Sequence, residues 1–212
     1  MVKVVVLGAH GQVAQIAERF MFADKDVKTS LFLRDAKRMA DKANEATIFE
    51  GSATDAAQLE KAMKGQDIVY ANLGGKDDID LEAEATIEAM HNANVKRLIW
   101  VSTLGIYDEV PGKFGEWNKE TIGDYISEYA KAAKRIEDSD LDYTIIRPTW
   151  MTDKNEVDYE KSKKGEEIKD TEVSRKSVAA YIYHLIKNPK EDVRESIGLG
   201  KPGTEGDKPS WY

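Results

Sequence analysis

The first residues of the chain restrict its fold more than any other part. Residues 2–7 read Val-Lys-Val-Val-Val-Leu, a run rich in β-branched side chains that predicts a buried strand. Gly8 and Gly11 follow directly, and apolar residues then recur at helical spacing from Val13 to Met21. A strand, a glycine turn and an amphipathic helix in this order predict the first βα unit of a parallel sheet.

The glycine turn has the spacing Gly8-x-x-Gly11-x-x-Ala14. Gly8 is expected to form the tight turn, Gly11 to leave room for a pyrophosphate, and Ala14 to let the helix pack closely on the sheet. The free N–H groups and the positive dipole end of the helix would then face the phosphates. His10 and Gln12 fit a phosphate contact and a solvent-facing position equally well. The residues predicted to contact a dinucleotide at this turn are Gly8, His10, Gly11, Gln12 and Val13.

Composition narrows the class of partner. The chain of 212 residues has a net charge of −8, which argues against nucleic acid or an anionic membrane, because both attract a basic face. It has no cysteine, so disulfides, thiolate metal sites and cysteine nucleophiles are excluded, and its three scattered histidines indicate no metal site. There is no signal sequence after Met1 and no apolar run near the roughly 18 residues of a membrane span. A soluble, cytoplasmic protein with a small-molecule partner is expected.

Strand and helix patterns alternate along the rest of the chain. Strands are predicted over residues 27–33, 46–50, 68–71, 96–101 and 141–147. Helices are predicted over residues 36–44, 55–64, 80–94, 119–138 and 174–188. This alternation predicts a doubly wound α/β fold of the Rossmann type, with a mainly parallel sheet, helices on both faces and a small C-terminal extension. We expect a single domain over 1–212, in which 150–212 supplies a cap on the substrate side and a tail.

Three segments fit this pattern less clearly. Residues 107–118 contain proline and glycine and are expected to be irregular, either a mobile flap with glycine hinges or an ordinary surface loop. Residues 194–199 are predicted to add an edge strand. The aromatic pair 211–212 is expected to fold back or to contact another subunit.

The long helix over 119–138 offers a possible dimer face, so a monomer and a homodimer are both consistent with the sequence.

The end of the second predicted strand indicates the cofactor. An acidic residue at this position accepts a hydrogen bond from the ribose 2′-hydroxyl of NAD, whereas an arginine can form charge-assisted bonds to the 2′-phosphate of NADP. Arg34 takes this position, Asp35 follows it, and Lys37 and Arg38 add positive charge. The sequence therefore favours NADP over NAD, while Asp35 is also suited to cap the next helix.

These features, with residues 101–103 (Val-Ser-Thr) and 141–148 (Leu-Asp-Tyr-Thr-Ile-Ile-Arg-Pro), resemble the atypical short-chain dehydrogenase/reductase superfamily in its NAD(P)H-binding, NmrA-like branch. The resemblance covers nearly the whole chain, and its late run over 141–148 is the most specific part. It implies adenine-side contacts from Arg34 and 51–55, and ribose and pyrophosphate contacts from 71–74. The residues that it adds to the cofactor site are Ser52, Ala53, Asn72, Leu73, Gly74, Ser102, Thr103, Pro148, Thr149 and Trp150.

The resemblance also implies a catalytic set, from which this sequence departs. Members place a Ser or Thr after the fifth strand and a Tyr-x-x-x-Lys pair on the next helix, where the lysine lowers the pKa of the tyrosine for proton transfer. Ser102 and Thr103 stand in the first place. If Tyr125 aligns with the helix tyrosine, Tyr129 occupies the lysine position, so either the preceding loop shifts the alignment or the usual proton relay is missing. The candidate catalytic residues are Thr103, Tyr125 and Ser102. Both helix tyrosines also fit a packing role, and Tyr107 is a second candidate proton donor.

Three functions are consistent with these residues. The leading one is NAD(P)H-dependent reduction of a small flavin-, quinone- or carbonyl-type acceptor, because acceptors that delocalise the added charge can take their proton from solvent. The missing lysine motivates a second, a non-catalytic NAD(P)-binding redox sensor of the NmrA type. A sugar-nucleotide epimerase or dehydratase is the third, although the C-terminal region is short for the usual substrate domain.

Overall fold

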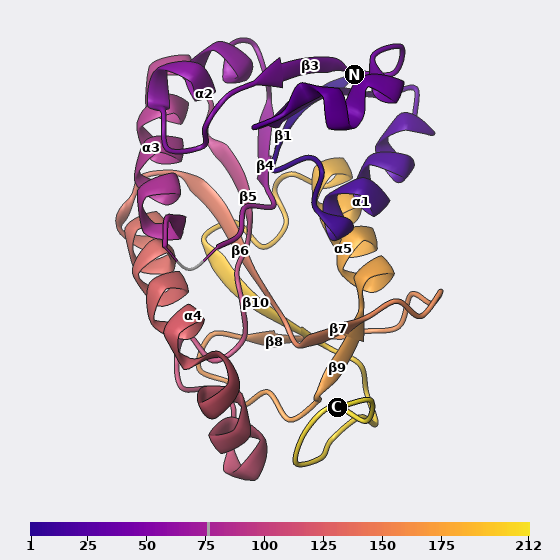
Figure 1. Ribbon diagram of the computed structural model, residues 1–212, viewed down its shortest axis with the longest axis vertical. Coiled ribbons are helices and arrows are strands. Elements are labelled where there is room, and N and C mark those ends of the chain that lie inside the picture. The colour runs from indigo at the N-terminus through magenta and orange to yellow at the C-terminus, as the bar shows by residue number, and fades with distance from the viewer. Residues whose placement is uncertain (76) are drawn as a thin grey trace.

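A central sheet organises the fold (Figure 1). The computed structural model describes residues 1–75 and 77–212, and within these ranges one sheet has eight strands. They are β1 (Val2–Leu7), β2 (Val27–Leu33), β3 (Thr47–Glu50), β4 (Ile68–Ala71), β5 (Arg97–Val101), β6 (Asp142–Pro148), β8 (Glu160–Lys163) and β10 (Glu195–Gly200). The order across the sheet is β3-β2-β1-β4-β5-β6-β10-β8. All neighbouring strands run parallel except β10 and β8, so the predicted Rossmann-type α/β fold is confirmed.

Helices cover both faces of this sheet (Figure 1). On one side α1 (Gln12–Phe22) packs against α5 (Arg175–Lys187), and on the other α2 (Ala56–Met63), α3 (Ile79–Ala93) and α4 (Gly112–Asp138) pack in succession. A 3-10 helix, η1 (Ala36–Lys42), follows β2. No helix within the described ranges is long and apolar enough to cross a membrane. The α/β alternation read from the sequence therefore corresponds to layers on either side of the sheet.

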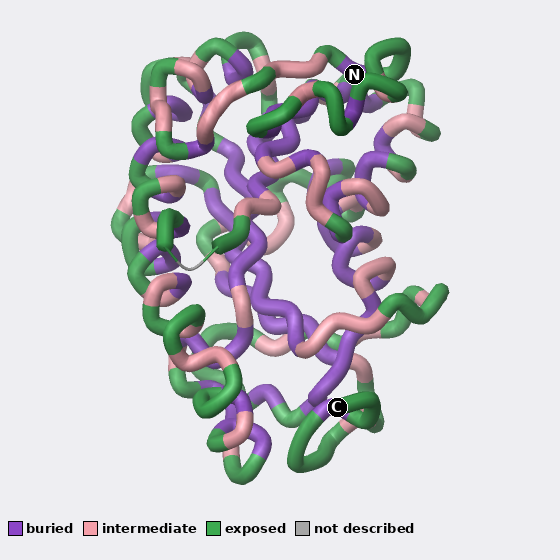
Figure 2. Tube along the Cα trace, in the orientation of Figure 1, coloured by how far each residue is buried: buried purple, intermediate pink, exposed green. Residues whose placement is uncertain are grey.

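The buried run at the start of the chain is explained by these two layers. Successive side chains of a strand point to opposite faces, and Val4 and Val6 join the core beneath α1 and α5. Val5 and Leu7 join the core beneath α2, α3 and α4. All four side chains are fully buried, and Figure 2 shows the strands buried between helices whose outer faces are exposed. A central parallel strand has no solvent-facing side, so its sequence shows no polar alternation.

The segment expected to be irregular at 107–118 is largely helical, which corrects that prediction. Helix α4 begins at Gly112, and Ile122 is the one residue in it with non-helical angles. A Cβ added to Gly115 would collide with the carbonyl oxygen of Val110, so this glycine permits a close packing contact rather than a hinge. Phe114 is buried beside Val110. The first two turns of α4 are thus tied to the preceding loop, and the flap interpretation is wrong.

The last third of the chain adds two features at the carboxyl ends of the strands. Strands β7 (Trp150–Thr152) and β9 (Glu172–Ser174) form a separate parallel pair directly after β6. The aromatic pair 211–212 folds back, and the rings of Trp211 and Tyr212 lie 6.2 and 5.5 Å from the ring of Trp150.

Strand β10 lies between β6 and β8, so it is an internal strand and not the edge strand predicted for 194–199.

Candidate functional site

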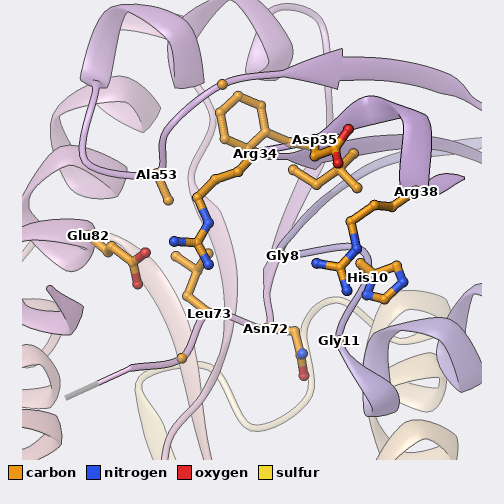
Figure 3. Close-up of a pocket in the computed structure, with 14 residues that line it drawn as sticks. Gly8, His10, Gly11, Arg34, Asp35, Arg38, Ala53, Asn72, Leu73 and Glu82 are labelled. Atoms are coloured by element: carbon orange, nitrogen blue, oxygen red, sulfur yellow. The ribbon is translucent and has the colours of Figure 1, made fainter. Parts of the chain in front are cut away.

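A cavity of about 390 Å³ lies at the carboxyl ends of β1, β2 and β4 (Figure 3). The strand order reverses here, because β1 pairs with β2 on one side and with β4 on the other, and such a point is where doubly wound sheets bind ligands. The residues that line this first cavity are Gly8, His10, Gly11, Phe32, Leu33, Arg34, Asp35, Arg38, Gly51, Ala53, Asn72, Leu73, Gly74 and Glu82. Segments that follow four different strands, β1, β2, β3 and β4, are thereby brought together.

The glycine turn is shaped by the lack of side chains. Gly8 has a φ of +72°, and a Cβ on it would collide with the carbonyl oxygen of Asn72. A Cβ on Gly11 would overlap the side-chain amide of Asn72. Gly11 is also the N-cap of α1, and no side chain caps this helix, so the first-turn N–H groups have no side-chain acceptor. Together these features form a cradle that a Cβ would fill. This cradle fits the pyrophosphate of a dinucleotide.

Two arginines that follow β2 line the first cavity. Figure 3 shows Arg34 extending into it towards Glu82, and Arg38 extending beside His10. Asp35 accepts a hydrogen bond from the backbone N–H of Lys37 at 3.2 Å and caps η1. The capping role considered for Asp35 is therefore present, and the guanidinium groups of Arg34 and Arg38 line the cavity as potential partners of an anion.

Glu82 is a lining residue that the sequence reasoning missed. It lies in the first turn of α3, and its Oε2 is buried with no hydrogen-bond partner among the described residues. Burial, aided by the nearby charge of Asp78, raises the pKa of Glu82 to about 7, while Arg34 opposes this shift. Glu82 lies at the start of the helix that follows the 71–74 turn, and this position could have indicated from the sequence that it lines the site. The charge facing Arg34 consequently changes near neutral pH.

A second cavity of about 360 Å³ lies at the carboxyl ends of β5 and β6. Its lining residues are Ser102, Thr103, Leu104, Ile122, Tyr125, Tyr129, Pro148, Thr149, Trp150, Met151, Arg175 and Trp211. Tyr129 lies close to the lining of the first cavity, because its hydroxyl is 3.5 Å from where a Cβ on Gly74 would be. The linings of the two cavities are therefore adjacent at Gly74 and Tyr129.

The three candidate catalytic residues, Ser102, Thr103 and Tyr125, all line the second cavity. The hydroxyls of Ser102 and Thr149 are buried and have no hydrogen-bond partner among the described residues. Unsatisfied buried hydroxyls are costly, so these two fit a polar group of a bound ligand. Tyr125 is 42% exposed and offers its hydroxyl to the same space.

The lysine expected beside a catalytic tyrosine has no substitute among the lining residues described. Burial raises the pKa of Tyr129, the residue in the lysine position, so its hydroxyl keeps its proton. The nearby Lys131 bonds to Glu128 at 2.7 Å. Tyr107, the second candidate donor, lines neither cavity and donates to Glu137 at 2.7 Å, which corrects that candidate. The described residues that line the second cavity therefore include no lysine beside Tyr125.

Three of the predicted cofactor contacts line neither cavity, and their roles remain predictions. The Ser52 hydroxyl bonds to that of Thr54 at 2.8 Å. Val13 is buried in the core under α1, and Gln12 is exposed. If these three residues contact a ligand, we expect the contact to come from their backbone atoms.

Comparison with known proteins identifies the family. The model of an NAD(P)H-binding family matches residues 8–189, which include the residues lining the first cavity and most of those lining the second. The chain belongs to this family. The family model and the fold together support assignment of the chain to an NAD(P)-binding superfamily of the atypical short-chain dehydrogenase/reductase type. The NmrA-like branch stays a prediction.

Three similar proteins agree with this assignment. A Rossmann-fold NAD(P)-binding protein from Shigella flexneri is 40% identical, with a TM-score of 0.85 and coverage of 99% of this chain and 98% of that one. A short-chain dehydrogenase/reductase from Veillonella parvula, in complex with NADP, is 30% identical, with a TM-score of 0.90 and 99% of each chain covered. A UPF0659 protein of Saccharomyces cerevisiae is 25% identical over 213 residues, covering 93% of this chain and 92% of that protein.

Proposed function

We propose that this member of the NAD(P)H-binding family is an NADP-dependent oxidoreductase that reduces a small aromatic or quinonoid acceptor. The observation that carries the proposal is the close approach of the two cavities at Tyr129 and Gly74. One cavity has the glycine cradle of a dinucleotide site, and the other has aromatic walls and hydroxyl groups without partners. Together they offer adjacent places for a cofactor and an acceptor.

The preference for NADP over NAD rests on Arg34 and Arg38. Both line the first cavity and follow β2, whose end is where the adenosine ribose belongs if the pyrophosphate lies at Gly11. A ribose 2′-phosphate there would accept charge-assisted hydrogen bonds from these guanidinium groups. The related protein from Veillonella parvula was crystallised with NADP, which supports this choice.

The chemistry follows from the residues around the second cavity. Bound NADPH supplies a hydride. Ser102 and Thr149 offer buried hydroxyls that can orient the ring end of the cofactor. Thr103 and Tyr125 can donate hydrogen bonds to an acceptor oxygen and polarise it. Because Tyr129 replaces the usual lysine, the proton that completes a hydroquinone comes from water, which suits acceptors that delocalise charge.

Anaerobic oxidation of NADPH, followed at 340 nm, tests this function. The acceptors would be 2-methyl-1,4-naphthoquinone, a flavin and a simple aldehyde. We expect saturable turnover with the quinone or the flavin and slower turnover with the aldehyde, which needs a stronger proton donor. NADPH binding without turnover of any acceptor would refute the proposal. That result would favour a redox sensor, the second candidate, which is motivated by Tyr129 in the lysine position.

A further inference from the structure

We infer that the second cavity binds a planar conjugated ring bearing an acidic substituent, with Trp211 against the ring and Arg175 against the acid. This inference rests on the proposed function and adds to it the shape and charge of the acceptor. It depends on two lining residues that contribute to neither the cofactor cradle nor the candidate catalytic set. Each is supported by separate contacts.

An aromatic cluster forms one wall of the cavity. The ring of Trp150 lies 4.8 Å from that of Trp117 and 6.2 Å from that of Trp211. Trp150 also donates its indole N–H to Asn118 at 2.9 Å, which fixes its orientation. Trp211 lines the cavity and remains 50% exposed. A flat ligand ring would cover this exposed indole, and aromatic pairs add to the gain from buried area alone.

The segment that carries Trp211 is held in place by hydrogen bonds. The backbone N–H of Ser210 donates to the Glu172 carboxylate at 2.6 Å. The hydroxyl of Thr171 donates to the carbonyl of Thr204 at 2.6 Å. Both anchors belong to or adjoin β9, which also leads into α5 and Arg175. The tryptophan and the arginine are therefore positioned by the same short strand.

Arg175 is the one arginine, lysine, aspartate or glutamate among the described residues that line this cavity. Its Nη1 donates to the Met151 carbonyl at 3.2 Å and to Asp153 at 2.8 Å. The Asp153 side chain is 82% exposed, and ion pairs of this kind contribute little to stability. A carboxylate or sulfonate within the cavity can therefore take the place of Asp153 on the guanidinium.

The surroundings of Arg175 are positive although the chain as a whole has a net charge of −8. A neighbouring cavity shares Arg175 and is also lined by Arg19, Lys176 and Lys154, with Asp153 as its one acidic residue among those described. Lys154 pairs with Glu172 at 3.3 Å, so Arg19 and Lys176 contribute most of the added positive charge. An anionic acceptor is thus favoured at this end of the site, whereas the apolar rings favour a flat, conjugated body.

Two matched ligands test the inference: anthraquinone-2-carboxylate and 2-(hydroxymethyl)anthraquinone, which share the ring system and differ in charge. Isothermal titration calorimetry with the NADP⁺-saturated protein measures both affinities. We expect the carboxylate to bind about tenfold more tightly or better, as a charge-assisted contact would give. Arg175→Gln should remove this preference, and Arg175→Lys should retain part of it. Lys176→Gln, a matched control that lines only the neighbouring cavity, should change it less than twofold.

Trp211→Ala should weaken both ligands several-fold while NADPH affinity stays the same. Quenching of tryptophan fluorescence gives a second readout, because Trp100 is buried in β5 and the other three tryptophans form the aromatic cluster. Equal affinity for the two ligands, or a preference that survives Arg175→Gln, would overturn the inference. The proposed function would still stand if the neutral quinone supported NADPH oxidation, so the two failures are distinguishable.

Discussion

Replacement of Arg34 by alanine should separate NADPH from NADH. Arg34 and Arg38 both line the first cavity, so in the proposed NADP site the variant loses one of two guanidinium groups available to a 2′-phosphate. A hydrogen bond to a charged group contributes about 1.5–3 kcal/mol, which corresponds to a roughly 10- to 150-fold rise in the dissociation constant. Arg34 is exposed, so we expect the lower end of this range for NADPH and little change for NADH.

The enhancement of NADPH and NADH fluorescence on binding would give both dissociation constants. Lys37→Ala is the matched control, because Lys37 is a neighbouring exposed cation that does not line the cavity. It should change either affinity by less than about twofold. Equal weakening of NADPH and NADH in Arg34→Ala, or no weakening of either, would refute the assignment of Arg34 to the 2′-phosphate.

Three further predictions concern buried acids. Burial raises the pKa of Glu18 to about 8, above its value of 4.5 in the unfolded chain, so stability should fall as pH rises between these values. Urea unfolding at several pH values should show Glu18→Gln gaining about 1 kcal/mol per pH unit relative to wild type over this window. The pKa of Glu82 is about 7, so NADPH should bind more weakly at pH 8 than at pH 6, and titrations of Glu82→Gln should show a smaller change. Glu109 pairs with buried Arg147 at 2.5 Å, so Glu109→Ala should cost about 3–5 kcal/mol in urea unfolding.

The parts of the site that depend on nearby residues could be predicted from the sequence. The Gly8–Gly11 turn and Arg34 each follow a strand whose hydrophobic pattern is clear, and a parallel sheet brings such strand ends to one edge. The second turn, over 71–74, follows the same rule. For this reason the first cavity contains most of the residues expected to hold the adenosine and pyrophosphate.

Residues placed by long-range packing could not be predicted. Arg175 and Trp211 reach the second cavity through the β7–β9 pair and the folded-back tail, and no local pattern links them to Thr103. Residues 107–118 were expected to be irregular because they contain proline and glycine, and a flap with glycine hinges was one of two interpretations. The close approach of Gly115 to Val110 exists only once the loop has folded against α4. Tertiary contacts therefore determine which residues line the second cavity.

The central claim is that this protein transfers a hydride from bound NADPH. A single-turnover reaction tests it most directly, with NADPH deuterated on one face of C4 and 2-methyl-1,4-naphthoquinone as acceptor without oxygen. Mass spectrometry of the NADP⁺ formed shows whether the label has left. We expect complete loss from one stereoisomer, complete retention from the other, and slower oxidation when deuterium is transferred. Label lost equally from both faces, or oxidation no faster than without protein, would contradict the account.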